Sequence, residues 1–513
     1  MSYTNTSYGT DALDSVTSNS NNTAVGAYAS LHTTTGINNV SLGSNALISN
    51  VSGSYNLAVG TAALCQNVDG VSNVACGTNA LEYNNGSFNT AVGVQALFGT
   101  PGSPFDSCTA VGYQALLSNT NSPNDAFGAS ALTANTSGSS NVAVGFQSLY
   151  TNTTGGNNVA VGTYTLTSND TGSNNVAVGT NSMESNADGQ YNVAIGTSAL
   201  NSGSSLNNCT AVGYIALSSN TTGQNDAFGS NALSTVTTGS NNCAFGLGSL
   251  KTTTGNSSSA FGSEALYNAN TGTNDAFGYR SLYNTTGTGN CAFGSLSLNA
   301  NTTGNYSSAF GQNTLTVSTG EANCAFGYNT LSSIGNVSSN NAFGCNALTA
   351  SNSGPNDAFG YNSLSRNMSG TGNCAFGFQS LNGMASQCSN SSAFGYCALF
   401  NNTGIGPNDA FGYNSLVSAV EGINNVSVGF NSGSNIVNGT DNTFIGYNST
   451  SNIDVTGSIV IGSGAVSTGS NQFVVGSSAV NAGAITVTPT FTQSATWTVW
   501  INGVEYYIPL QAV

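Results

Sequence analysis

Two stretches of the chain, TGSNNVAVGTNSM at residues 171–183 and TGQNDAFGSNAL at residues 222–233, share one frame. Each has a turn, followed by Asn, Ala, Gly and a further apolar residue in the same order. They differ on either side of the Ala, where two Val residues of the first stretch become Asp226 and Phe228 in the second. A fixed frame with exchanging neighbours indicates an internal repeat, so the rest of the chain should be searched for it.

The frame returns along the chain at a nearly constant period. A glycine recurs along the chain from Gly26 to Gly476, with a weaker start at Gly9. The spacing between consecutive members is nearly always 16 or 17 residues. A second glycine usually lies six or seven residues earlier, as Gly172 does before Gly179. Glycine supplies positive φ angles in turns without steric cost. Each unit therefore offers two short strand-like pieces, such as NVAVG and TNAL, joined by Gly- and Asn-rich turns.

This period predicts an all-β chain, folded as a parallel β-solenoid or β-roll of about 29 coils with 16–17 residues per coil. Such short units have no core of their own and become stable only by stacking on neighbouring coils. We expect three parts: an N-terminal segment at residues 1–8, the solenoid at residues 9–476 and a C-terminal cap at residues 477–513.

The C-terminal part differs from the solenoid. Its sequence TWTVWINGVEYYIPL alternates in polarity and contains Asn502-Gly503, a strong hairpin turn signal. Both tryptophans of the chain, Trp497 and Trp500, lie here. We expect a β-hairpin that caps the open end of the solenoid, or that serves as a trimerisation or docking segment.

Side-chain bulk is exchanged between two positions of the frame. With the repeat glycine as position 0, the residues at positions −3 and −1 share a face, because side chains of a strand alternate. Wherever position −1 is Phe, position −3 is Asp, Cys, Ser or Asn. Close packing favours such compensation. We therefore expect this face to look into the core, and the nearly constant alanine at position −2 (Ala177, Ala227, Ala276) to face a neighbouring chain.

The charge balance excludes several partners. The formal net charge is −16, from 19 acidic residues against Lys251, Arg280 and Arg366. Binding to phosphate-rich nucleic acid or anionic membrane needs many Lys and Arg side chains, which this chain lacks. No apolar run approaches the ~20 residues that span a bilayer, and the N-terminal residues carry no secretory signal pattern. We expect neither nucleic-acid binding nor membrane insertion.

The sequence favours neither a metal site nor catalysis. The eleven cysteines lack CxxC spacing, and His32 is the single histidine, so zinc ligation and His-based nucleophilic catalysis are disfavoured. We expect no cofactor, no metal, no catalytic residue and no enzymatic activity. One acidic series at position −3 stays open between cation binding where chains meet and carboxylates hydrogen-bonded to adjacent Asn side chains or turn amides: Asp125, Asp226, Asp275, Asp357 and Asp409.

A cysteine series occupies the same position −3, at Cys243, Cys291, Cys324 and Cys374. Interchain disulfides are one interpretation, and free thiols that act as small buried apolar groups are the other. Successive members lie two or three coils apart, beyond disulfide reach within one chain. We favour free thiols. Many N-x-S/T sequons, such as those at Asn135, Asn152, Asn220, Asn284 and Asn301, are expected by chance in so Asn- and Thr-rich a chain.

The frame NNVAVG and the segment GSIVIGSGAVSTGSNQFVVGSSAV at residues 457–480 resemble the head repeats of trimeric autotransporter adhesins, the YadA-like heads. Arrays of N-x-A-x-G-x-x-A-L are also similar to those of phage tail fibres and giant-virus surface proteins. The ending WTVWINGVEYYIPLQAV is similar to C-terminal strands of some giant-virus fibre-like proteins. The resemblance implies a left-handed parallel β-roll with three chains wound side by side.

These features lead us to expect a homotrimeric structural fibre or spike on a virion surface, used in host attachment. Its partners would be its own copies, other virion or surface proteins at one end, and a host surface glycan or protein receptor. One alternative is an adhesin on a bacterial cell surface, or a phage adhesin or tail fibre. Less favoured are an ice-binding solenoid, which needs a Thr ladder in constant register, and a glycan-degrading tailspike, which needs a carboxylate pair.

Overall fold

The fold was analysed in a computed structural model, which describes residues 4–17, 20–269, 272–383, 388–404, 406–452, 454–477, 496–501 and 504–509. The described residues form an all-β parallel solenoid of about 27 turns and contain no helix. The number of turns is slightly below the predicted 29 or so. The chain divides into two compact units, Met1–Pro355 and Asn356–Val513, which are described separately.

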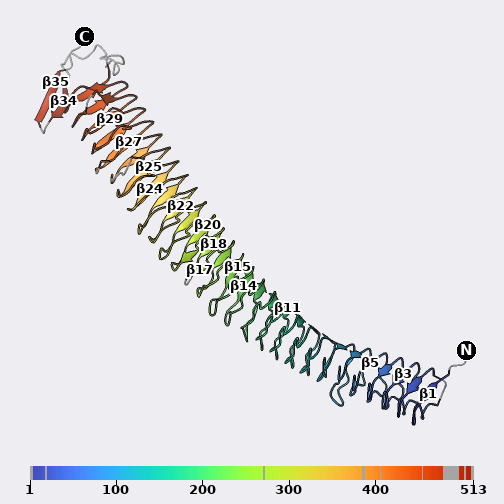
Figure 1. The fold of residues 1–513 in the computed structure, drawn as a ribbon. Coiled ribbons are helices and arrows are strands. Elements are labelled where there is room, and N and C mark those ends of the chain that lie inside the picture. Colours follow the sequence, from blue (N-terminus) through green and yellow to red (C-terminus); the bar gives the residue numbers. More distant parts are fainter. Residues whose placement is uncertain are drawn as a thin grey trace. The chain divides into compact units, whose positions relative to one another are not determined.

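In the first unit, each coil adds one short strand to a parallel sheet, and consecutive strands pair in chain order (Figure 1). The strands pair with identical frame positions opposite one another, as in Ala177 with Ala194. These strands are β1 (Thr6–Tyr8), β2 (Thr23–Val25), β3 (Val40–Leu42), β4 (Leu57–Val59), β5 (Val74–Cys76), β6 (Thr90–Val92), β7 (Thr109–Val111), β8 (Asn124–Phe127), β9 (Asn141–Val144), β10 (Val159–Val161), β11 (Val176–Val178), β12 (Val193–Ile195), β13 (Thr210–Val212), β14 (Asn225–Phe228), β15 (Asn242–Phe245), β16 (Ser259–Phe261), β18 (Asp275–Phe277), β20 (Cys291–Phe293), β21 (Ser308–Phe310), β22 (Cys324–Phe326) and β23 (Asn341–Phe343).

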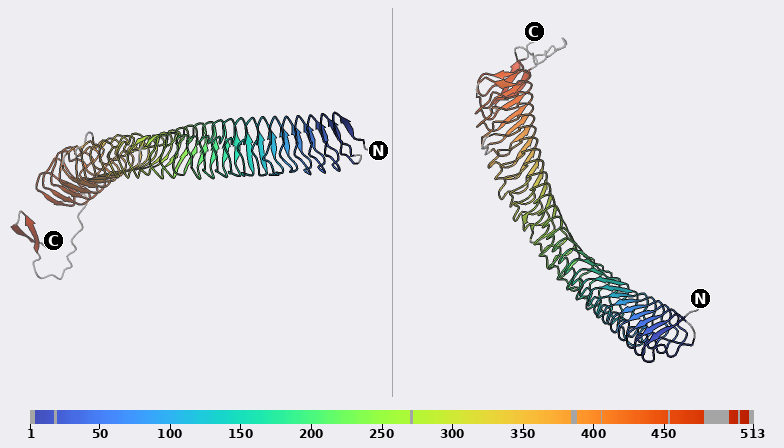
Figure 2. Two further views of the ribbon diagram at one scale, coloured as in Figure 1. Left: turned by 90° about the horizontal axis from the view of Figure 1, so that it is seen from below. Right: turned by 45° about the vertical axis from the view of Figure 1, so that its right-hand side comes forward.

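The second unit repeats this arrangement, and Figure 2 shows the coils of each unit stacked one after another. Its sheet strands are β24 (Asn356–Phe359), β25 (Asn373–Phe376), β26 (Ser392–Phe394), β27 (Asn408–Phe411), β28 (Asn425–Val428), β29 (Thr443–Ile445), β31 (Ile459–Ile461) and β33 (Phe473–Val475). Small parallel pairs add β17 (Asn268–Ala269) with β19 (Asn284–Thr285) in the first unit, and β30 (Thr450–Ser451) with β32 (Val466–Ser467) in the second.

The predicted C-terminal hairpin is present. Strand β34 (Thr496–Ile501) pairs antiparallel with β35 (Val504–Pro509), and Ile501 lies opposite Val504. The turn residues Asn502 and Gly503 lie outside the described residues. The capping, trimerisation and docking roles of this hairpin stay predictions.

Only one of the two predicted strand-like pieces in each coil is a strand. The NVAVG piece contains β11, whereas TNAL-type segments form turns in which alternate residues have left-handed backbone angles. In the coil after Gly179, Asn181 has φ 56° and Met183 has φ 49°. Left-handed angles are unfavourable for residues with a Cβ. The repeated turn closes a narrow coil and directs the fully buried side chain of position +4, such as Leu166, into the core.

The predicted inner and outer faces of the strands are wrong. Positions −3 and −1 were expected to face the core, but position −2 does so instead. The alanines at position −2, including Ala177, Ala227 and Ala276, are fully buried within the chain. Position −1 lies outside instead, where Phe228 is half-buried and Phe127 is 42% exposed. The alternation of side chains was predicted correctly, but the thin coil takes alanine in most coils, where a leucine lies opposite, and takes Phe444 where position +4 is Gly433. The alanines therefore cannot face other chains.

Buried asparagines at position −4 form a column that ties each coil to the next. Asn175 Nδ2 donates a hydrogen bond to the carbonyl oxygen of Gly189 at 2.8 Å. The backbone N–H of Asn192 donates to Asn175 Oδ1 at 3.0 Å. These bonds give buried amide groups their partners, which buried polar groups require. The column was visible in the frame as a recurring Asn, but its buried position was not predicted.

A second buried asparagine column lies at position +7. Asn169 Nδ2 donates to Asn152 Oδ1 at 2.7 Å, and Asn186 Nδ2 donates to Asn169 Oδ1 at 2.9 Å. Of the sequon asparagines, Asn284 lies half-buried in β19. The other four named sequon asparagines are fully buried in this column: Asn135, Asn152, Asn220 and Asn301. Their side chains are therefore inaccessible to glycosylation in the folded coil.

The repeat glycines are required by close approach between coils. Gly179 has φ 127°, and a Cβ built on it would lie 2.7 Å from the carbonyl carbon of Gly196. Both the backbone angle and the space exclude a side chain at this corner of the coil. Each coil therefore needs one glycine at this corner, and the 16–17-residue period of the sequence is the chain length between two such glycines.

Candidate functional site

A ladder of stacked phenylalanines covers the outer face of the first unit. The rings at position −1 from Phe228 to Phe343 stack coil upon coil, with centroid separations from 4.3 to 5.0 Å. Neighbouring ring planes differ by only 3–6°. The phenylalanines of the ladder are half-buried, and the most exposed members are Phe245 (36%) and Phe293 (37%). At 150–250 Å² per aromatic side chain, this ladder exposes at most on the order of 500 Å² of apolar surface.

The same column continues toward the N-terminus as aliphatic side chains. Val25, Leu42, Val92 and Ile195 are 38–41% exposed on this face. An apolar stripe therefore runs along the strands of the first unit. Exposed apolar patches above a few hundred Å² mark interaction sites on soluble proteins.

The second unit carries two aromatic ladders. One continues the pattern at position −1 from Phe359 to Phe411, with stacked rings 4.4–5.0 Å apart. The other lies at position +1, just after the repeat glycines, with rings 4.9–5.3 Å apart. Its members are Tyr361, Phe378, Tyr396, Tyr413, Phe430 and Tyr447, all of them exposed.

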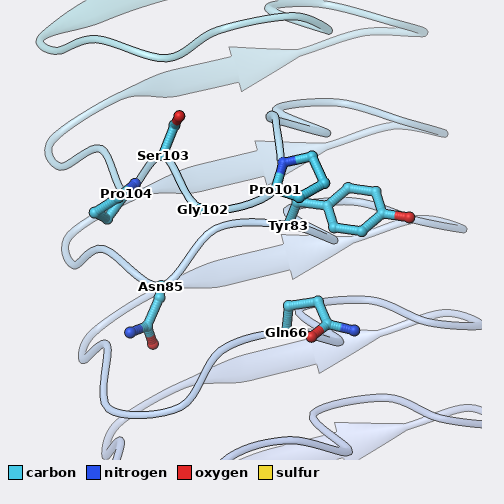
Figure 3. A pocket seen from close by; sticks show the side chains of 7 residues that line it. All are labelled: Gln66, Tyr83, Asn85, Pro101, Gly102, Ser103 and Pro104. Atoms are coloured by element: carbon cyan, nitrogen blue, oxygen red, sulfur yellow. The ribbon is translucent and has the colours of Figure 1, made fainter.

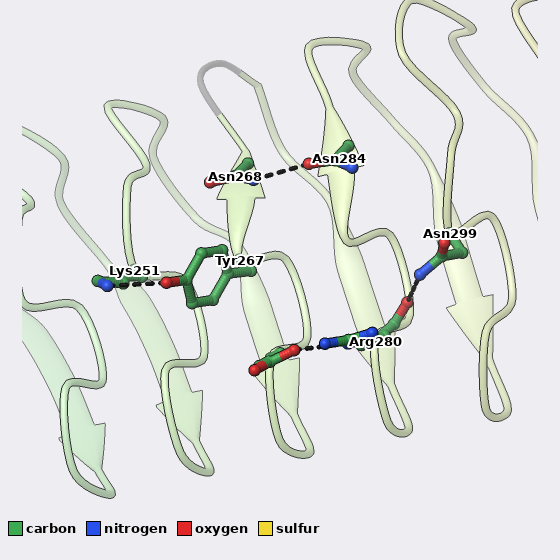
Figure 4. Close-up of polar contacts among 7 residues, drawn as sticks. Lys251, Tyr267, Asn268, Arg280, Asn284 and Asn299 are labelled. Atoms are coloured by element: carbon green, nitrogen blue, oxygen red, sulfur yellow. Dashed lines mark hydrogen bonds and ion pairs between the residues drawn. The ribbon is translucent and has the colours of Figure 1, made fainter.

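A cluster of basic and tyrosine side chains lies on neighbouring coils of the first unit (Figure 4). Lys251 Nζ donates a hydrogen bond to Tyr267 Oη at 2.8 Å. The Tyr267 ring stacks on Tyr283 at 5.1 Å. Arg280 Nε donates to Glu264 Oε2 at 2.6 Å, in an ion pair whose side chains are 41% and 26% exposed.

Arg280 makes further contacts that hold it in this cluster. Its guanidinium carbon lies 5.1 Å from the ring centroids of both Tyr279 and Tyr283. Asn299 Nδ2 donates to the Arg280 carbonyl oxygen at 2.9 Å (Figure 4). An exposed ion pair contributes little to stability, up to about 1 kcal/mol. Two of the three cations of the chain are thus engaged with neighbouring coils.

The acidic series at position −3 lies on the outer face beside the Phe ladder. Asp226 and Asp275 are exposed, and Asp125, Asp357 and Asp409 are half-buried. The backbone N–H of Ser392, in strand β26, donates to Asp409 Oδ1 at 3.2 Å. Within the described part of the chain, no group of three or more His, Cys, Asp or Glu residues could hold a metal ion.

The cysteine series at position −3 is not buried as expected. Its members lie half-exposed on the same outer face, because position −3 points away from the core: Cys243, Cys291, Cys324 and Cys374. Partial burial raises the pKa of the Cys243 thiol, and the Asp226 carboxylate raises it further.

Four other cysteines are buried and were not singled out from the sequence: Cys108, Cys209, Cys388 and Cys397. Cys108 and Cys209 are 1% exposed and replace asparagine at position −4 of the buried column. Cys108 Sγ lies 3.5 Å from the Asp106 carbonyl oxygen and 3.8 Å from the Asn121 carbonyl oxygen, and both are acceptors for the thiol. Burial raises the pKa of the Cys108 thiol to about 11. The shared frame position was the signal that could have identified Cys108 and Cys209.

These features define the chain as a β-solenoid repeat protein with side-chain ladders on its outer faces. No family model, curated protein or solved structure matches it. Among the described residues, no helix is long and apolar enough to cross a membrane. The single histidine, His32, is exposed and belongs to none of the ladders.

Proposed function

We propose that the chain is a structural fibre or spike of a virion surface, assembled as a homotrimer and used in host attachment. The observation that carries the proposal is the exposed apolar stripe along the strands of the first unit. The proposal assigns the chain no catalytic role and no cofactor.

The stripe supports self-association. A specific interface buries about 800 Å² per partner, and the Phe ladder with its aliphatic continuation offers an area of that order. The chain carries few charges, with 19 acidic and three basic residues in 513, so copies could pack closely along this face. The contact surface of the proposed trimer is therefore position −1, in place of the buried alanines.

The hydrogen-bonded coils support a fibre. Each is tied to its neighbour by strand pairing and by buried asparagines, a construction that gives length without a large core. The virion location, the left-handed winding and the three-fold assembly rest on the resemblance to fibre and adhesin-head repeats. The proposed partners are other surface proteins at one end, and a host glycan or protein receptor.

Sedimentation velocity and native mass measurement of the full chain test the assembly. We expect a trimer, and the triple variant Phe245→Ser, Phe277→Ser, Phe310→Ser should dissociate at concentrations where the unmodified chain stays assembled. A stable monomer of the unmodified chain would contradict the proposal.

A matched control and a location test complete the design. The variant Tyr113→Ser, Tyr214→Ser, Tyr306→Ser removes three rings that are 53–69% exposed outside the Phe ladder, and it should assemble normally. Antibodies against the chain should label the surface of intact virions, and the soluble chain should compete with particle attachment. Labelling only after particle disruption would exclude a surface fibre.

A further inference from the structure

The longest interval between consecutive repeat glycines runs 19 residues, from Gly93 to Gly112. The extra residues form a loop with the sequence TPGSP at residues 100–104. The backbone N–H of Ser103 donates to the Thr100 carbonyl oxygen at 3.2 Å, which closes a turn within it. Loops on a rigid scaffold commonly carry binding residues.

The loop is anchored at its C-terminal end by Phe105. This side chain is 2% exposed and lies in the core. Its backbone N–H donates to Asn84 Oδ1 at 3.0 Å, and its carbonyl oxygen accepts from Asn89 Nδ2 at 3.0 Å. Phe105 thereby occupies the acceptor position that Gly86 fills for Asn73 in the preceding coil. The turn bond and the Phe105 anchor restrain the loop, and such restraint lowers the entropic cost of binding.

The anchored loop lies beside two preceding coils and borders a half-open hollow of ≈ 470 Å³ (Figure 3). This volume lies within the roughly 300–1,000 Å³ of small-molecule sites. The side chains that line it are Gln66, Tyr83, Asn85, Pro101, Ser103 and Pro104.

The lining combines rings with neutral polar groups. The Tyr83 ring is held edge-on against Phe98, with centroids 4.9 Å apart and planes at 85°. Asn85 Oδ1 accepts from the backbone N–H of Val68 at 2.6 Å, which fixes this amide and leaves Nδ2 as the donor for recognition. Gln66 adds a second, exposed amide. No lining side chain carries a charge.

We propose that this hollow binds a neutral saccharide. A pyranose ring presents a face of C–H groups, which packs on Tyr and Pro rings, and a rim of hydroxyls, which pair with side-chain amides. An anionic sugar would find no cation in the lining and a net charge of −16 on the chain. The proposal rests on the proposed function, because it names the class of receptor that an attachment fibre would bind.

Saturation-transfer difference NMR on the full chain tests the site. The probes are the methyl glycosides of glucose, galactose, mannose and N-acetylglucosamine, with N-acetylneuraminic acid as the anionic comparison. We expect transfer to the ring C–H protons of at least one neutral glycoside. Its affinity should fall about fivefold to tenfold in Tyr83→Ala, the range of one aromatic contact, and should fall in Gln66→Ala.

The controls separate a local effect from unfolding. Tyr214→Ala removes a ring that is 55% exposed on another coil, and it should bind like the unmodified chain. Gln66 is exposed, so its variant keeps the fold even if Tyr83→Ala melts early. The proposal is overturned if no neutral glycoside shows transfer, if only the anionic sugar does, or if Gln66→Ala binds normally. Loss of saccharide binding with intact trimers and surface labelling would leave the fibre proposal standing.

Discussion

Ala177 and its equivalents fill the narrowest part of each coil, so the space around them limits what can replace them. Ala177 is fully buried and stacks between Ala160 and Ala194 of the adjacent coils. We expect Ala177→Val to destabilise the fold by about 1–3 kcal/mol through overpacking. Denaturant unfolding, together with hydrogen exchange at neighbouring amides, measures this cost.

The adjacent outer residue provides the matched comparison. Val178 is half-buried on the opposite face of the same strand, and Val178→Ala should cost less than about 1 kcal/mol, near the range of surface substitutions. If Ala177→Val and Val178→Ala lowered the free energy of unfolding equally, position −2 would not be the inner face of the strand.

Cys108 makes the stability of the chain depend on pH in the alkaline range. Burial raises the pKa of its thiol from 9.0 to about 11. Between these values the unfolded chain releases the proton while the folded chain keeps it, so raising the pH favours unfolding. The contribution of the neutral thiol is fully present below about pH 9 and lost by about pH 11, amounting to roughly 2–3 kcal/mol.

Urea unfolding of the unmodified chain and of Cys108→Ser, compared at a series of alkaline pH values, isolates this effect. The variant should lose less stability than the unmodified chain as the pH rises. Cys76→Ser, at an exposed position, should keep the unmodified dependence. Parallel curves for the unmodified chain and Cys108→Ser would contradict a buried neutral thiol.

The buried asparagine column joins successive strands more specifically than apolar contact does. Asn158 Nδ2 donates to the Gly172 carbonyl oxygen at 2.8 Å, and Asn158 Oδ1 accepts from the Asn175 N–H at 3.0 Å. Asn158→Ala leaves both backbone groups buried without these partners, at about 1–3 kcal/mol each. We expect much faster hydrogen exchange at the Asn175 amide, with a smaller effect several coils away. Thr180→Ala, at an exposed position, should leave that exchange unchanged.

Assembly through an apolar stripe has a characteristic response to salt. Raising sodium chloride from about 0.05 M to about 1 M screens exposed charges but should not dissociate the proposed trimer, because its contact face is apolar. Sulfate should strengthen the association, since it favours the burial of apolar surface. Sedimentation velocity across these conditions provides the measurement. Dissociation by sodium chloride would point to charged contacts, such as the Arg280–Glu264 pair, in place of the Phe ladder.

The period of the glycines in the sequence predicts the solenoid architecture. Gly179 and its equivalents return at the interval of one coil, and that interval, with the short apolar piece before each glycine, predicted short parallel strands stacked in register. The alternation around Ala177 also followed from sequence, because strand geometry places positions −3 and −1 on one face. The hairpin near Asn502-Gly503 was predicted from its turn signal, and the flanking strands confirm it.

Which face of the strand points inward was decided only by the tertiary structure. Alternation groups Asp226 with Phe228 but does not say whether the pair is inside or outside. The left-handed turn residues make the coil so narrow that alanine, leucine and asparagine fill most coils, and the phenylalanines of position −1 are left outside. The hollow beside residues 100–104 likewise depends on Phe105 entering the core. The alternation of residues along a strand determines which side chains lie on the same face. The circumference of the closed coil determines which of the two faces is buried.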